Sequence, residues 1–170
     1  SIVDEKNWLY NWYNHPTTKS IIQNDNSFKS DPRFESVPDS QRYDALLTDA
    51  LTTDFFAVDL PSDYKSDESL GFYAKGSDDN SSKFIWLNPT ILRHSDKQTI
   101  FDKHKPNTSA ALHEYNHAVQ DSFGIYNNEE DDSKPYELQH KELHSGLMSF
   151  RKGFGLTPDK RDYSEKEVME

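Results

Sequence analysis

Apolar side chains recur every three or four positions in two segments of the first third of the chain, as they do on one face of an α-helix. The first segment predicts a helix over residues 4–14 that ends near Pro16. Its apolar positions are Trp8, Leu9, Trp12 and Tyr13. The second predicts a helix with its N-cap at Asp39 or Ser40. Its apolar positions are Tyr43, Leu46, Leu47, Ala50 and Leu51. Between the two, residues 20–39 contain two Xaa-Pro breaks and predict a loop.

The period of the pattern changes after the second helix. Residues 55–60, 70–74 and 84–87 are short runs rich in aromatic and aliphatic side chains, which predict three strands. Residues 76–82 are polar and turn-forming, so we expect them to join the last two strands into a β-hairpin with a long loop.

The second half of the chain predicts helices again. A short turn is expected at 96–103, a helix at 108–121 that Gly124 stops, and a helix at 136–152 that Gly153 and Gly155 close. The pattern Ser164-x-x-Glu167 is a capping box for a short last helix. The order of elements predicts an α+β fold with a small mixed or antiparallel sheet and a helical C-terminal part. We expect one domain over 1–170, with a polar N-terminal arm (1–39) and a core (40–170).

Composition narrows the class of protein. The 170 residues carry 19 Lys and Arg against 30 Asp and Glu, a formal net charge of −11, while 13% of them are aromatic. So many aromatic residues indicate a folded domain. The chain has no basic stripe, so we expect it to bind neither nucleic acid nor an anionic membrane surface. It has no apolar run long enough for a transmembrane helix. Because it has no cysteine, a metal would have to be held by His and carboxylate groups.

The strongest chemical signal is His-Glu-Tyr-Asn-His at residues 113–117, inside the helix predicted at 108–121. The spacing of His113 and His117 places both imidazoles on one face, one turn apart, where they can bind one Zn²⁺ ion. Glu114 then lies beside the metal without binding it. From there it can take a proton from a zinc-held water, whose pKa is lowered to about 7, and pass it to a leaving amine.

This motif, with its apolar flanks Ala-Leu and Ala-Val, resembles the zincin metallopeptidases. The predicted hairpin before the motif also resembles the edge-strand region of many zincins, and the resemblance covers about residues 70–152. It implies a zincin-like fold, with an edge strand over the motif helix, and a zinc endopeptidase activity. It also implies that residues 84–88 line the cleft and bind a protein or peptide substrate as an added strand.

The resemblance further implies a third protein ligand. The third His of the metzincins is absent after His117, so we look to the next helix, where gluzincins place a Glu. The candidates there are Glu137, His140, Glu142 and His144.

Helical geometry favours Glu142 as the third ligand. One face of this predicted helix is apolar and consists of Tyr136, Leu143, Leu147 and Phe150. His140 borders this face. Glu142 lies on a different face, together with Ser145, Gly146 and Ser149. These small residues allow a close approach to the motif helix, which a carboxylate ligand needs because zinc–oxygen distances are only about 2.0–2.2 Å. The next candidates for the third ligand are, in order, Glu137, His144 and His140.

A group that stabilises the oxyanion is also expected. The candidates are Tyr126, Tyr136, His140 and His144, and His144 is the first choice.

The Asp that gluzincins often place four residues after the ligand Glu is replaced by Gly146. Asp121 is a candidate for orienting a ligand His, although a helix-end charge is the preferred explanation. The acidic run at 129–132 favours a solvated loop over a calcium site.

A hypothesis from another class is also open. On this hypothesis the domain holds zinc without turnover, as a structural or binding module of a larger assembly such as a viral particle or mobile-element protein. The short last helix, a first residue other than Met and the polar N-terminal arm motivate it. A processing protease within its own assembly is a third hypothesis. A secreted or virion-associated location is slightly favoured over a cytoplasmic one.

Overall fold

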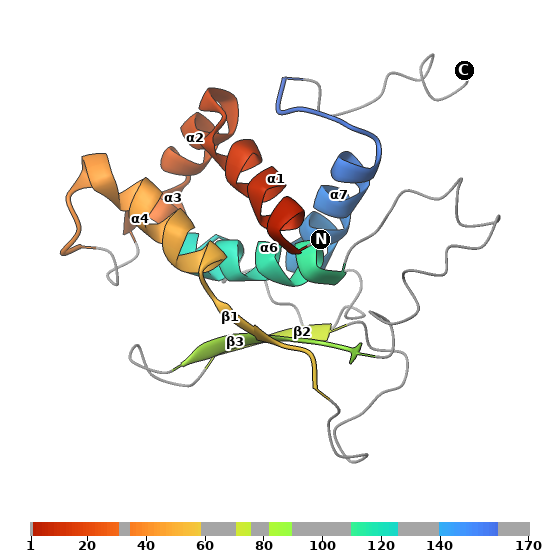
Figure 1. The fold of residues 1–170 in the computed structure, drawn as a ribbon. Coiled ribbons are helices and arrows are strands. Elements are labelled where there is room, and N and C mark those ends of the chain that lie inside the picture. The colour runs from red at the N-terminus through yellow and green to blue at the C-terminus, as the bar shows by residue number, and fades with distance from the viewer. Residues whose placement is uncertain are drawn as a thin grey trace, which may run out of the picture.

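The structure is a computed structural model that describes residues 2–30, 35–58, 71–75, 82–89, 110–125 and 140–159. Within these ranges the chain forms six helices and a three-stranded mixed sheet, which confirms the predicted α+β class. Helix α6 (Ala110–Phe123) lies between the sheet and the other helices (Figure 1). The turn predicted at 96–103, most of the hairpin loop and the short helix after Ser164 lie outside the described residues.

Three helices form the N-terminal part. Helix α1 (Ile2–Asn14) matches the first predicted helix, and Pro16 opens α2 (Pro16–Gln23) as its first residue. Helix α3 (Asn26–Ser30) follows. The loop predicted over 20–39 is therefore wrong for most of residues 20–30. These helices are short and each buries only one large apolar side chain, Ile22 in α2 and Phe28 in α3, so they leave no period in the sequence.

The N-terminal helices belong to the hydrophobic core. Leu9, Trp12 and Tyr13 of α1 are buried in the same cluster as the apolar residues of α6. The Tyr13 ring contacts the ring of Phe123 with a centroid distance of 5.9 Å. The segment predicted as a polar arm thus supplies part of the core that supports α6.

Helix α4 (Asp39–Leu51) packs against α6, and all five apolar residues predicted to share one face are buried. The Tyr43 ring stacks on Phe123 at 4.7 Å, and the Ser122 hydroxyl donates to the Leu46 carbonyl at 2.7 Å. The predicted cap is wrong by one residue. Pro38 occupies the N-cap position without a side-chain hydrogen bond, and Asp39 is already helical.

The sheet consists of β1 (Asp54–Phe56), β2 (Gly71–Lys75) and β3 (Lys83–Leu87) in the order β1-β3-β2. The predicted hairpin is confirmed, because β2 pairs antiparallel with β3. On its other side β3 pairs parallel with β1. The prediction that residues 84–88 form an edge strand is therefore wrong for 84–86, since these residues of β3 pair with β1 on one side and with β2 on the other. Strand β2 is the one that contacts α6 most extensively.

The two faces of the sheet differ. Ile85 and Leu87 of β3 are buried in the core shared with the helices. On the opposite face the rings of Phe56, Phe72, Phe84 and Trp86 contact one another. The sheet therefore covers one side of α6 with its aliphatic face.

Helices α6 and α7 (His140–Gly153) end as predicted near glycines. Gly124 and Gly155 have φ values of 72° and 65°, a conformation that glycine adopts at low cost after a helix. The apolar face of α7 lies away from α6, because Leu143, Leu147 and Phe150 are 38–49% exposed. In the part of the chain that the structure describes, no helix is both long and apolar enough to cross a membrane.

Candidate metal centre

The His-Glu-x-x-His motif lies on the buried helix α6, which holds its two histidines side by side. The flanking residues Ala111, Leu112, Ala118 and Val119 are all buried, as a helix packed on several sides requires. His113 and His117 are one helical turn apart, and their ring centroids are separated by 4.7 Å. Their Nε2 atoms lie 3.1 Å from each other.

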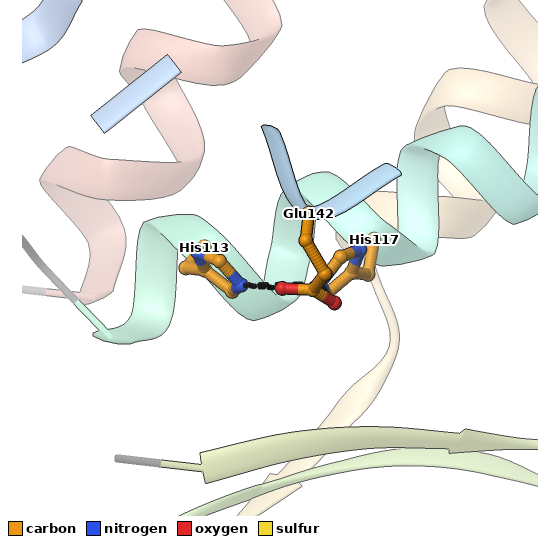
Figure 2. A group of neighbouring side chains, drawn as sticks. All are labelled: His113, His117 and Glu142. Atoms are coloured by element: carbon orange, nitrogen blue, oxygen red, sulfur yellow. Dashed lines mark hydrogen bonds and ion pairs between the residues drawn. The ribbon is translucent and has the colours of Figure 1, made fainter. Parts of the chain in front are cut away.

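The carboxylate of Glu142 in α7 reaches between the two imidazoles (Figure 2). Its Oε2 atom is 2.9 Å from Nε2 of His113, and its Oε1 atom is 2.8 Å from Nε2 of His117. The structure therefore brings together the three residues that the sequence predicts as metal ligands. Of the rival third ligands, His140 is exposed at the start of α7 and is not part of this group, whereas Glu137 lies outside the described residues.

Small side chains allow the close approach of α7 to α6. Ser145 and Ser149 are buried on the same face of α7 as Glu142. The Ser145 hydroxyl donates to the backbone carbonyl of His113 at 3.3 Å. Gly146 was predicted on this face as well, but it is exposed, and a Cβ atom there would meet nothing within 4 Å.

The spacing of these atoms fits a small divalent cation. Ligands about 2.0–2.2 Å from a tetrahedral zinc ion are about 3.3–3.6 Å from one another. The two Nε2 atoms are 3.1 Å apart and each lies 2.8–2.9 Å from a different oxygen of Glu142, so small shifts of these side chains open the position. Two imidazoles and one carboxylate, without sulfur, are a donor set that zinc accepts.

Against the effect of burial, the neighbouring carboxylates raise the pKa of His117. Burial alone lowers the pKa of His117, but its hydrogen bond and ion pair with Glu142 act in the opposite direction. Hydrogen bonding to Gln120 and the charge of Glu114 add to this, so the pKa of His117 lies above its usual value. The carboxylates thus favour positive charge here, either a proton on His117 or a cation between the ligands.

Glu114 is buried between α6 and the sheet, and its side chain is only 6% exposed. Burial raises the pKa of Glu114 above its usual value, and the negative charge of Glu142 acts in the same direction. The charges of His117 and His113 and a backbone hydrogen bond from Tyr73 in β2 oppose the shift without cancelling it. A carboxyl group with a raised pKa is better suited to exchange a proton near neutral pH.

His144 lies in α7, two residues after Glu142, and is not part of the group of three ligands. Its Nδ1 atom lies 3.1 Å from the Asn116 side-chain amide and 2.8 Å from the Gln120 side-chain amide. Burial, and then the positive charges of Arg151 and His117, lower the pKa of His144 to about 3. A neutral ring bonded in this way contributes to the packing of α6 on α7. These contacts do not support the predicted role of His144 in stabilising an oxyanion.

Other predicted residues also have defined places. Asp121 bonds to the Tyr73 hydroxyl at 2.8 Å and pairs with Lys75 at 3.5 Å, so it ties α6 to β2. Nδ1 of His117 lies instead 2.8 Å from the Gln120 amide oxygen and 3.4 Å from the Ser145 hydroxyl. Tyr126, Tyr136 and the acidic run at 129–132 lie outside the described residues.

Sequence reasoning missed the polar residues that support the ligands. Asn116 is fully buried, and its side chain bonds to the Tyr13 hydroxyl, to Ser145 at 3.0 Å and to His144. Gln120 bonds to His117 at 2.8 Å. The one available signal was the spacing of Gln120, which is three residues after His117 and therefore on the same side of the helix.

Comparisons of the chain with protein-family models, with curated proteins and with solved structures find no match.

Proposed function

We propose that the protein is a zinc-dependent metallopeptidase of the zincin type, in which His113, His117 and Glu142 bind Zn²⁺ and Glu114 is the general base. The observation that carries the proposal is the convergence of three ligand groups from two helices, with one ligand atom from each within 4.8 Å of the others, beside a buried carboxyl group. Three protein ligands leave one position of a tetrahedral ion for water or substrate, which is the arrangement of catalytic zinc sites.

A zinc ion held there would supply Lewis acidity and lower the pKa of a water molecule to about 7. Glu114 follows His113 directly in the motif, so its carboxylate can remove a proton from that water. The same carboxyl group then donates the proton to the amine that leaves when a peptide bond is broken. Its raised pKa supports the first transfer, because a group that binds protons more tightly accepts one more readily.

Exposure indicates the side from which a peptide enters. The His113 side chain is 29% exposed, whereas those of His117 and Glu142 are 10% and 8% exposed. The substrate therefore approaches beside His113. Strand β2 borders the site through the contact of Tyr73 with Glu114.

Three preparations test the proposal. The wild-type chain should bind about one zinc ion per molecule and hydrolyse a labelled, unfolded protein such as casein. Glu114→Gln should retain the zinc and lose the hydrolysis, and Glu142→Ala should bind zinc more weakly. Asp49→Asn is the control, because Asp49 pairs with Lys83 at an exposed position remote from the site and its loss should change neither property.

The outcomes separate the competing hypotheses. Less than a tenth of a zinc ion per chain would remove the metal site and with it both zinc hypotheses. One zinc ion per chain with no hydrolysis of any substrate would favour the structural or binding module. Full activity of Glu114→Gln would show that Glu114 is not the base.

A further inference from the structure

Gln120 lies in the third turn of α6, three residues beyond His117, and is almost fully buried, with 3% of its surface exposed. Its side-chain nitrogen donates to the backbone carbonyl of Lys141 at 3.0 Å. A backbone carbonyl can only accept a hydrogen bond, so this contact determines which end of the amide carries the nitrogen. The oxygen, Oε1, must then face His117.

The orientation of the amide in turn selects the form of the histidine. Oε1 of Gln120 lies 2.8 Å from Nδ1 of His117, and an amide oxygen can only accept. Nδ1 must therefore carry the proton and donate it. In the neutral ring the lone pair is then on Nε2, which is the atom that points to Glu142 and His113. This is the tautomer that a metal ligand at this position needs.

The same amide joins the two helices that carry the ligands. Lys141 directly precedes Glu142, and its carbonyl lies in the first turn of α7. Gln120 thus connects the residue before the third ligand to the second ligand through one side chain. Its nitrogen also lies 2.8 Å from Nδ1 of His144, which accepts from it. Since every polar atom of this buried amide has a partner, a rotation of the amide would break several hydrogen bonds at once.

We propose that Gln120 is a positioning residue of the metal site, which holds His117 in the Nδ1–H tautomer and aligns it with Glu142. The inference depends on the zinc site of the proposed function, but it concerns a residue that does not touch the metal. Loss of such a partner of a ligand His lowers metal affinity by about 10- to 100-fold.

Two measurements on zinc-loaded protein test the role of Gln120. In the wild type, ¹⁵N NMR of the His117 ring should show a protonated Nδ1 and a metal-bound Nε2. Zinc affinity, measured by competition with a chromophoric chelator, should fall by about 10- to 100-fold in Gln120→Leu. Gln120→Glu keeps an oxygen acceptor for the Nδ1 proton but loses the donor to the Lys141 carbonyl, so it should retain the tautomer and recover part of the affinity.

Ser122→Ala is the matched control. Ser122 is buried on the same helix, but its hydroxyl bonds to Leu46 in α4, away from the ligands. This variant should lose stability and keep the zinc affinity of the wild type. An equal loss of affinity in Ser122→Ala and Gln120→Leu would reduce the effect to general destabilisation and overturn the inference. Coordination through Nδ1 of His117 in the wild type would also overturn it, even if Gln120→Leu does not fold.

The two proposals fail in different ways. If the wild type binds no zinc, the proposed function fails. If the wild type binds zinc and Gln120→Leu binds it equally tightly with an unchanged His117 spectrum, only the role of Gln120 fails.

Discussion

The neutral, half-buried His144 should make the protein lose stability as the pH falls. Its ring lies between α6 and α7, and Nδ1 accepts hydrogen bonds from the Asn116 and Gln120 amides. Burial is the main reason why the pKa of His144 is lowered to about 3, from 6.5 in the unfolded chain. Between these two values the unfolded chain binds a proton that the folded protein does not bind, so acid favours unfolding.

The size of the effect follows from the two pKa values. The contribution of His144 is fully present above pH 6.5 and is lost progressively as the pH falls from 6.5 to about 3. Each pH unit in that window costs about 1.4 kcal/mol. At pH 5, which is 1.5 units below 6.5, the free energy of unfolding is lower by about 2 kcal/mol than at pH 8.

The variant His144→Gln isolates this contribution. The Gln side chain can accept from the same amides through its oxygen, but it does not bind a proton in this range. Urea unfolding of both proteins should be measured at pH 8, 6 and 5. A chelator should be present, because zinc binding would add a pH dependence of its own. We expect the wild type to lose about 2 kcal/mol more than the variant between pH 8 and pH 5. Equal losses in the two proteins would refute the argument.

Two further predictions concern the fold. A Cβ atom at Gly71 would lie 2.4 Å from the backbone oxygen of Trp86, so Gly71→Ala should lower the free energy of unfolding by about 1–3 kcal/mol. Gly146 lies in helix α7 with open space around it, so Gly146→Ala should raise the free energy of unfolding by up to about 1 kcal/mol. Equal urea midpoints for both variants would contradict the close pairing of β2 with β3. Leu9→Ala should cost about 2–5 kcal/mol because Leu9 is fully buried, and Val3→Ala on the exposed side of α1 should cost little. A cost near zero for Leu9→Ala in urea unfolding would show that α1 does not belong to the core.

The sequence predicted the elements that have a strong local period. The helix at 4–14 and the helix that follows the Asp39-Ser40 cap were predicted because their apolar residues repeat every 3.6 positions, and the helix at 108–121 was predicted to stop at Gly124. Helices α1, α4 and α6 follow these predictions closely. Local spacing also placed His113 and His117 on one face of α6. The face that carries Glu142 was inferred from its small neighbours, because a helix fixes which side chains lie together.

Pairing between distant segments was not available from the sequence. Strand β3 reads as a short apolar run whether it lies at the edge or at the centre, and only its parallel pairing with β1 decides between the two. The apolar residues of α7 show a clear helical face, but nothing local shows that this face lies away from α6. Helices α2 and α3 depend on core contacts that they make with other elements, so their own sequences predicted a loop.

The sequence by itself therefore determined the chemistry of the candidate site, namely the two histidines, the adjacent Glu114 and a carboxylate on a following helix. Only the tertiary structure decided how these groups are supported. The hydrogen bonds of Gln120 reach from α6 to the first turn of α7, and those of Asn116 reach to α1 and α7. The physical reason is one of distance along the chain. The period of a helix relates residues three or four positions apart, whereas these partners are 21 to 103 positions apart and meet only when the helices pack.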